Sequence, residues 1–485
     1  MQFLTLFSFI PAALAYSNPI CYFTPCAHTS SGLVAGHTAA NRHSVTEYLG
    51  IPFAQPPIAH LRFAAPQPYI GTGFINGTDF FGSTAAEIYN GARIADEEDI
   101  IVVSLNYRVG VFGFPGALDP QNPVKNLGLL DQRLALEWVR DNIGAFGGDP
   151  ERITLAGQSA GAISVDYHSY AYSHDPIVSG MILQSGTAQA PSTGASSISS
   201  PLEIWIDLAT KLNCTSSPSD TSSSSASASA SAILHCMRSP SLTTSTILSI
   251  AHLYPSSFTP IVDNLTVFPT SLYPSLTPAP IPLLIGSTDN EGEIFAARTL
   301  MTDAPLNDTA KDALTRESFT CPAAVRARVS GAKIWRYRYF GDFEELRLRR
   351  RGGSAAYHVG DVYMVFGNWA MGDWKPVVMR EQERVGRYMR GAWGAFVREP
   401  ERGLSGYRGV RGDVDEESTV RELRNEGNSQ RVMKLGDEDE MGGEVEGRGW
   451  PTYEEGRKTL VRLGWENRVG ANLGWPRTYD EDCSH

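Results

Sequence analysis

The sequence predicts an α/β protein with a mainly parallel sheet. An unbroken β-branched run at Ile100–Asn106 is followed by apolar residues at helical spacing in Leu127–Asn142. The short apolar strand Ile153–Ala156 likewise leads into a small-residue helix at Ala160–Tyr167. Further apolar runs at 181–184, 282–286 and 333–340 have the character of buried strands. Strands that alternate with helices form parallel sheets covered by helices on both faces.

Length and composition indicate a folded globular protein with either one very large core or two to three ordinary ones. The chain has 485 residues, of which 42% are hydrophobic and 19% charged, a globular composition. A net charge of −12 and a sequence pI near 5.4 argue against binding to nucleic acid or to anionic membranes through the overall electric field. Small neutral or cationic partners remain open, and residues 16–485 are expected to form a single domain.

The first fifteen residues have the pattern of a secretory signal peptide. MQFLTLFSFIPAALA is apolar and ends in Ala13, Leu14 and Ala15, which predicts cleavage before Tyr16. The run is too short to span a bilayer, and no later segment is long enough, so no transmembrane anchor is expected. Six cysteines and four N-glycosylation sequons fit a secreted protein; the sequons begin at Asn76, Asn213, Asn264 and Asn307.

Two stretches are expected to be flexible insertions. Residues 215–232 are low-complexity Ser and Ala, and they lie between Cys214 and Cys236. Residues 401–449 are rich in charge and glycine, with few large apolar side chains. Neither stretch has enough apolar surface to form a packed core of its own.

A serine lies between two glycines in FGGDPERITLAGQSAGAIS, residues 146–164. The bare GxSxG pattern is weak, but here a strand runs directly into it and a helix follows. Ser159 is therefore predicted at the tip of a nucleophile elbow, where Gly157 and Gly161 avoid clashes between strand and helix. The helix N-terminus would favour negative charge developing on a bound carbonyl oxygen.

This segment resembles the signature of type-B carboxylesterases, the α/β-hydrolase family that includes cholinesterases and fungal extracellular lipases. Other stretches are similar in the same order: YLGIPFAQPPIAHLRFAAPQP (48–68), YNGARIADEEDIIVVSLNYRVGVFGF (89–114), NLGLLDQRLALEWVRDNIGAFGGDP (126–150) and GWPTYEEGRKTL (449–460). The resemblance implies an α/β-hydrolase fold and hydrolysis of carboxylic esters or lipids without a cofactor. Neither a metal-binding HExxH motif nor a phosphate-binding loop occurs in the sequence.

The resemblance also nominates the partners of Ser159. Glu291, in STDNEGEIF, matches the family's catalytic acid, and His358, in AAYHVGD, matches its general base. The histidine would take the serine proton while the carboxylate orients the ring. Glu293 is close enough to be confused with Glu291, and only the motif separates them. His168 is expected to be structural, as is His174.

One family segment has no counterpart here. Family members have a strand and a HGGGF-type loop, which supplies most of the oxyanion hole, before the YNG segment; this chain passes directly from Phe80 to Phe81. The central sheet is therefore expected to lack one strand, between 100–106 and 153–156. The Ala160 amide would remain as the oxyanion donor, since no apolar strand positions the glycines of 71–73.

Two explanations of this gap remain open: an exon omitted from the reading frame, which the abrupt junction favours, or a genuine loss. The first gives a secreted serine esterase or lipase that works through an acyl-enzyme. The second gives an impaired or inactive binding or adhesion protein. Acyl specificity, the choice between lipase and esterase, and the oligomeric state are not indicated by the sequence.

The cysteines allow several pairings, because spacing alone does not determine connectivity. Cys214 with Cys236 resembles a family disulfide. Cys321 and Cys483 are candidates for a second, long-range bridge, and Cys21 with Cys26 for a local one.

Overall fold

A six-stranded sheet forms the centre of the protein in a computed structural model. The structure describes residues 19–40, 42–76, 84, 86–116, 125–190, 200–215, 226–254, 257–299, 306–329, 331–348, 353–368, 380–405, 407, 409, 450, 460–463, 472–474 and 483. The strand order is β11-β10-β9-β8-β7-β6, and every pair is parallel except β10 with β11. The strands are β6 (Thr154–Gln158), β7 (Gly180–Gln184), β8 (Leu283–Thr288), β9 (Ile334–Tyr339), β10 (Leu460–Leu463) and β11 (Asn472–Gly474).

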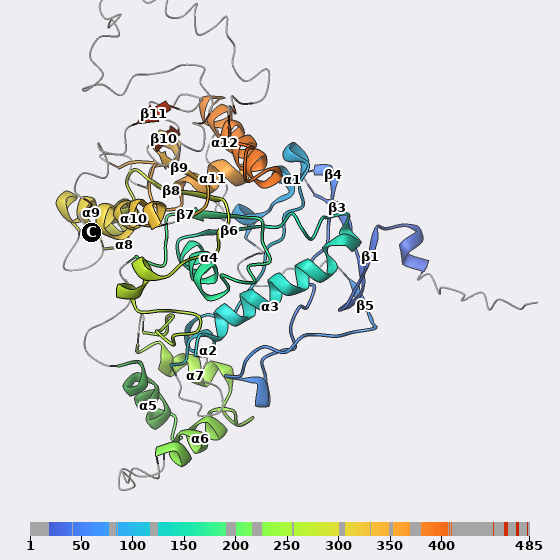
Figure 1. The fold of residues 1–485 in the computed structure, drawn as a ribbon. Coiled ribbons are helices and arrows are strands. Elements are labelled where there is room, and N and C mark those ends of the chain that lie inside the picture. Colours follow the sequence, from blue (N-terminus) through green and yellow to red (C-terminus); the bar gives the residue numbers. More distant parts are fainter. Residues whose placement is uncertain are drawn as a thin grey trace, which may run out of the picture.

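Helices cover both faces of this sheet (Figure 1). On one face α3 (Leu127–Asn142), α4 (Ala160–Ala171) and α10 (Cys321–Val329) share an apolar core with the strands. On the other, α1 (Ala92–Glu98), α11 (Gly360–Phe366) and α12 (Arg380–Arg398) pack against alternate strand residues. Leu183 thus belongs to the first core and Ile182 to the second. This confirms the predicted α/β-hydrolase architecture, a mainly parallel sheet between two helical layers.

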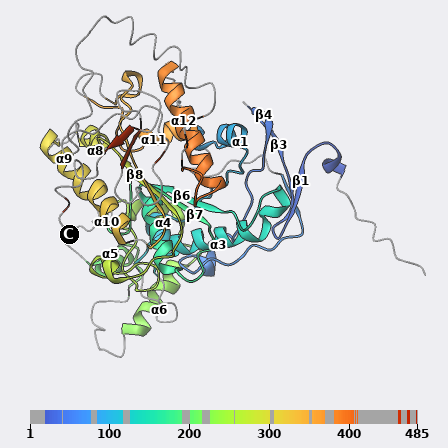
Figure 2. The same cartoon turned by 45° about the horizontal axis from the view of Figure 1, so that its top comes forward.

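The remaining elements surround the sheet. The N-terminal part forms two small sheets, one of β1 (Cys26–Thr29), β2 (Gly32–Ala35) and β5 (Phe74–Asn76) and one of β3 (His37–Ala39) and β4 (Arg42–Glu47). Helices α5 to α7 share their own apolar core with Leu127 at the start of α3, and α6 lies near the lower end of the molecule in Figure 1 and Figure 2. The further helices are α2 (Gly110–Gly113), α5 (Pro201–Lys211), α6 (Ala226–Met237), α7 (Thr244–Ala251), α8 (Gly292–Thr299) and α9 (Asp308–Thr315).

Three of the sequence expectations require correction. Residues 100–106 form no strand: they are irregular, and the side chains of Ile101 and Val103 are 44% and 48% exposed. An extended segment becomes a strand only when a neighbour pairs with its backbone, and the six-stranded sheet already ends at β6. The predicted flexible insertion at 215–232 extends too far, because residues 226–232 belong to α6. Strands β10 and β11 were not foreseen.

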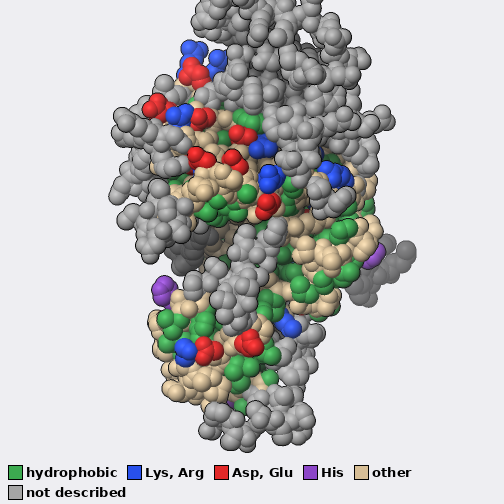
Figure 3. Space-filling view, turned by 90° about the vertical axis from the view of Figure 1, so that its left-hand side faces the viewer, with side chains coloured by type: hydrophobic (Ala, Val, Ile, Leu, Met, Phe, Trp, Pro, Cys, Tyr) green, Lys and Arg blue, Asp and Glu red, His purple; other side chains and the backbone are tan. Residues whose placement is uncertain are grey.

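Other expectations lie largely outside the described residues. This holds for the signal peptide at 1–15, for the 80–81 junction, and for all of 401–449 except 401–405, 407 and 409. Among the described residues, no helix is both long and apolar enough to cross a membrane. On the face drawn in Figure 3, acidic and basic side chains lie interspersed among those that the structure describes.

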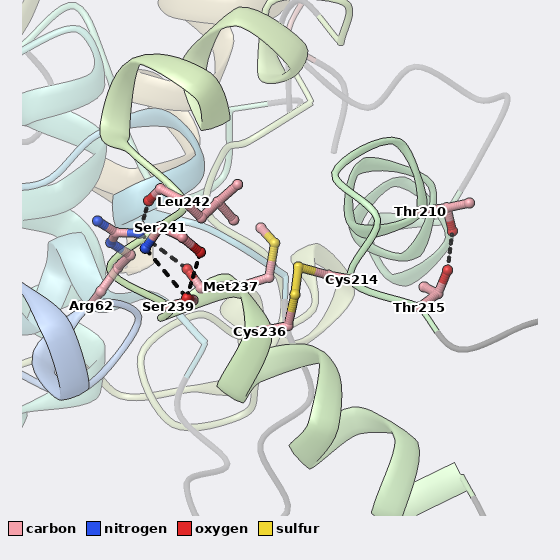
Figure 4. The surroundings of a disulfide bond; sticks show 9 residues. All are labelled: Arg62, Thr210, Cys214, Thr215, Cys236, Met237, Ser239, Ser241 and Leu242. Carbon is pink, nitrogen blue, oxygen red and sulfur yellow. Dashed lines mark hydrogen bonds between the residues drawn. A yellow bond between two sulfur atoms is a disulfide. The ribbon is translucent and has the colours of Figure 1, made fainter.

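The cysteines pair as Cys21–Cys26, Cys214–Cys236 and Cys321–Cys483, which confirms the proposed pairings. The second bridge joins the end of α5 to α6 (Figure 4). Next to it, the Arg62 guanidinium donates to the carbonyls of Met237 and Leu242 at 3.2 and 2.7 Å. The bridge links α6 to the end of α5, and the Arg62 bonds hold the end of α6 against the N-terminal part of the chain.

Removing either of the two longer disulfides should cost stability, and the one that closes the longer loop should cost more. Cys214–Cys236 spans 22 residues and Cys321–Cys483 spans 162. The chain-entropy relation gives a loss of about 3 kcal/mol for the first and about 5 kcal/mol for the second. Equilibrium urea unfolding of the two double Cys→Ser variants measures both values. A larger loss for the shorter loop would contradict this expectation.

Candidate active site

Ser159 occupies a strained turn between β6 and α4. Its backbone angles are φ 56° and ψ −122°, a region that non-glycine residues rarely adopt. A Cβ at Gly157 would lie 2.3 Å from the carbonyl carbon and oxygen of Gly161, so glycine is required at 157 as expected. The same expectation for Gly161 is wrong, because a Cβ there would meet nothing within 4 Å. The tight contact in this elbow therefore falls on one glycine.

The loops that carry Glu291 and His358 lie against each other. Asn290 forms a parallel bridge with Tyr357, and its amide donates to the Ala356 carbonyl at 2.9 Å. Glu291 Oε2 lies 2.5 Å from His358 Nδ1, and both side chains are buried. Because a carboxylate only accepts, this contact places the ring hydrogen on Nδ1 and leaves a lone pair on Nε2.

The Glu291 carboxylate has a second set of donors. Its Oε1 accepts hydrogen bonds from the Ser185 hydroxyl at 2.6 Å and from the Thr288 amide at 2.7 Å. Ser185 directly follows β7 and has a positive φ of 57°. The sequence analysis did not identify Ser185 as part of the site. Its position could have suggested it, because it directly follows β7, the strand that pairs with β6. These bonds fix the carboxylate so that its other oxygen faces His358.

Glu293 is placed differently from Glu291. Its carboxylate is fully buried and pairs with Lys311 Nζ at 3.0 Å. The structure therefore brings Glu291, and not the neighbouring Glu293, to His358.

The Ser159 hydroxyl makes no hydrogen bond to His358 among the described residues. Instead, His358 Nε2 lies 3.2 Å from the side-chain nitrogen of Gln158, the residue immediately before Ser159. The imidazole packs against Phe295 and Phe319, which also contact each other; its ring centroid lies 5.6 and 4.9 Å from theirs. The ring thus reaches the elbow, and its free nitrogen faces Gln158 in this arrangement.

One backbone donor is available beside the serine. Ala160 is the first residue of α4, and its amide has no acceptor in the part of the chain that the structure describes. The glycines at 71 and 73 are engaged elsewhere: the Gly71 amide donates to the Ser30 carbonyl at 3.1 Å, and the Gly73 carbonyl accepts from Leu33 at 3.0 Å. They belong to the N-terminal sheet and offer no substitute for an oxyanion loop.

A second buried acid, Asp361, lies three residues after His358, in the first turn of α11. Asp361 Oδ2 accepts from Gln184 Nε2 at 3.0 Å and from the Tyr337 hydroxyl at 2.7 Å. Burial raises the pKa of Asp361, and these two hydrogen bonds oppose the rise.

Within the described residues, no group of three or more His, Cys, Asp or Glu side chains could hold a metal ion.

His168 lies on α4, away from the Glu291 contact. It is 9% exposed, and its Nε2 donates to the Pro176 carbonyl at 3.0 Å. Burial lowers the pKa of His168 to about 4. His174 is exposed at the surface. In this structure neither histidine meets Glu291.

The depressed pKa of His168 predicts acid sensitivity. Between pH 6.5, the ordinary pKa of histidine, and about pH 4, His168 is protonated in the unfolded chain and neutral in the folded chain. The free energy of unfolding should therefore fall by about 2.5 kcal/mol from pH 7.5 to 4.5 through this group alone. His168→Gln keeps a donor for the Pro176 carbonyl and removes the titration. Urea unfolding at both pH values tests this, and an unchanged pH dependence in the variant would contradict it.

Comparison with known proteins identifies the family. The sequence model of the carboxylesterase family matches residues 24–71 and 73–320, more than half of the chain. The chain belongs to the carboxylesterase family. A chlorogenic acid esterase of Aspergillus niger is 32% identical over 77% of this chain and 83% of its own, and the secreted lipase 5 of Gibberella zeae is 28% identical over 78% and 86%. This carboxylesterase chain is therefore a carboxylic ester hydrolase by family.

The fold of this carboxylesterase is also that of a solved esterase. A thermophilic pNB esterase matches with a TM-score of 0.66 at 20% identity, over 94% of this chain and 99% of its own. The match supports the α/β-hydrolase fold of the described elements.

The alignment with the Aspergillus niger esterase contains many positions at which this chain has a gap. The 448 aligned positions with the Aspergillus niger esterase exceed by about 75 the roughly 373 residues that 77% of this chain represents. The relative therefore has about 75 residues opposite gaps in this carboxylesterase. The family match is also interrupted at residue 72.

Proposed function

We propose that this chain is a secreted serine esterase that cleaves carboxylic esters through an acyl-enzyme on Ser159. The observation that carries the proposal is the buried contact of 2.5 Å between Glu291 and His358, with the other ring nitrogen directed at the residue next to Ser159. These residues are far apart in sequence and come from three separate loops. A strained elbow, a ring with a fixed hydrogen and a buried acid are the parts that such a reaction requires.

In the proposed reaction, the Ser159 oxygen attacks the ester carbonyl while His358 Nε2 accepts its proton. The tetrahedral intermediate collapses, the C–O bond to the alcohol breaks, and His358 returns the proton to the leaving oxygen. Water then attacks the acyl-enzyme by the same proton route and releases the acid. Glu291 holds the hydrogen on Nδ1 and stabilises the imidazolium at each stage.

We infer that the oxyanion hole is incomplete and that activity is correspondingly low. The Ala160 amide is the one donor that the described site offers. The Aspergillus niger esterase has in total about 75 residues opposite gaps in this chain, and the family match is interrupted at residue 72; both support the loss of a segment in the region 72–81. Loss of one oxyanion donor typically lowers the rate by about a hundredfold to a thousandfold.

A second function follows from the same gap. The β6 edge has no partner among the described strands, and Ala156 on β6 is exposed. A protein with this edge and without a full oxyanion hole could act as a binding or adhesion module of the same fold.

Substrate and location are part of the proposal. The fungal relatives are named as a chlorogenic acid esterase and a secreted lipase, so chlorogenic acid esters and lipid esters are both candidate substrates here. Three disulfides fit an extracellular protein. Asn213, Asn264 and Asn307 are exposed and accessible to glycosylation, whereas the side chain of Asn76 lies outside the described residues.

Hydrolysis of p-nitrophenyl acetate and p-nitrophenyl butyrate tests the function. The purified chain should release p-nitrophenol above the buffer rate, and Ser159→Ala should abolish the difference because it removes the attacking oxygen. Folding of both proteins is checked by circular dichroism. A folded chain whose rate equals that of Ser159→Ala would leave the binding module as the better account.

A further inference from the structure

The side chain of Gln158 donates a hydrogen bond to His358 Nε2, the nitrogen whose lone pair the proposed reaction needs. Gln158 is the last residue of β6, and its Nε2 lies 3.2 Å from His358 Nε2. An amide nitrogen only donates, and His358 already directs its Nδ1 hydrogen to Glu291. The contact is therefore a hydrogen bond from Gln158 to the basic nitrogen of His358.

An imidazole nitrogen has one lone pair in the plane of the ring, so two donors compete for it. The proton of Ser159 must reach the same lone pair when the serine attacks. In the described structure the amide is bonded there and the Ser159 hydroxyl is not. Attack by Ser159 therefore requires that Gln158 first give up this bond.

The surroundings indicate which side chain moves in that exchange. His358 is 5% exposed, and its ring packs against Phe295 and Phe319 and bonds to Glu291. Gln158 is only half-buried, on the strand that forms the edge of the sheet. The amide has room to rotate, whereas the ring is fixed.

We propose that Gln158 is a positioning residue that keeps His358 uncoupled from Ser159 in the resting enzyme. The proposal rests on the proposed function, because it assigns a role relative to Ser159 and His358. It predicts that removing the amide speeds attack by Ser159 without changing how tightly a reagent first binds.

Saturation kinetics with a fluorophosphonate separate these two quantities. In the labelling step the Ser159 oxygen bonds to phosphorus, fluoride leaves, and His358 takes the proton. Gln158→Met keeps the length of the side chain and removes the donor. Its maximal labelling rate constant should rise about 5-fold, with the half-saturating concentration unchanged within 2-fold; a 5-fold change corresponds to about 1 kcal/mol, the size of one neutral hydrogen bond.

Gln189→Met is the matched control. Both amide atoms of Gln189 are buried without a hydrogen-bond partner, on the loop that follows β7. The same exchange of amide for thioether there should leave the labelling rate unchanged within 2-fold. Gln158→Leu serves as a second variant if Gln158→Met does not fold by circular dichroism.

The outcomes distinguish this role from the function itself. Equal or slower labelling of folded Gln158→Met, or an equal acceleration in Gln189→Met, would overturn the role of Gln158 and leave the esterase proposal intact. Labelling of no variant, with the starting protein folded, would overturn the esterase proposal on which the role depends. A selective rise in the rate constant supports both.

Discussion

Insertion of the strand and glycine loop of a relative between residues 80 and 81 should raise ester hydrolysis by at least a hundredfold. The donor segment is the stretch of the Aspergillus niger esterase that corresponds to the missing family segment, the strand and the HGGGF-type loop. Its glycine amides would join Ala160 as oxyanion donors, and such a donor is typically worth about a hundredfold to a thousandfold in rate. The turnover number with p-nitrophenyl butyrate measures the effect.

The same insertion should also stabilise the protein. Strand β6 ends the described sheet, and residues 100–106 remain irregular although their sequence is that of a strand. Ala156 on β6 and the side chains of Ile101 and Val103 are exposed here, so a strand paired at this position would bury apolar surface and add backbone hydrogen bonds, which together contribute several kcal/mol.

A second chimera separates the two effects. Replacing the loop glycines of the insert by proline removes the amide hydrogens and leaves the strand. That protein should gain stability in urea unfolding but little of the rate. If the unmodified insert folds and the rate stays at the level of the starting chain, the loss of oxyanion donors does not explain low activity.

Glu291→Gln should lower the turnover number by about a thousandfold to ten-thousandfold. The amide has the shape of the carboxylate but can present hydrogens to His358 Nδ1, which favours the wrong tautomer of the ring and removes the charge that stabilises imidazolium. The change is measured as turnover per active site, titrated with a fluorophosphonate.

Glu293→Gln is the matched comparison, because Glu293 is the neighbouring acid that could be confused with Glu291 in the sequence. Its partner is Lys311, so the variant should lose stability by a few kcal/mol while each folded molecule keeps its rate within a few-fold. If Glu293→Gln lost activity per site and Glu291→Gln kept it, the assignment of the acid would be reversed.

Local sequence patterns predicted most of the central fold. The strands β6, β7, β8 and β9 and the helix α3 lie within two residues of the ranges expected from apolar runs and helical spacing. These elements have a buried pattern that the chain itself carries. Residues 100–106 have the same pattern and form no strand, because a strand also needs a neighbour that the sequence pattern cannot supply.

Other differences arise from packing and from side-chain placement. The Ser/Ala run was expected to be irregular, yet alanine favours helix, and α6 carries the buried side chains of Leu234 and Met237 at its end. The family motifs identified Glu291 and His358 as candidates, and the structure places them in contact. The contact of Gln158 with His358 depends on one side-chain rotation, which no local pattern specifies.

The most direct measurement of the central claim is a peptide map after labelling with a fluorophosphonate. The account predicts one adduct, on the hydroxyl of Ser159, and its loss in a folded His358→Ala variant. An adduct on another residue, or full labelling of Ser159 without His358, would contradict the convergence of acid, base and serine on which this account rests.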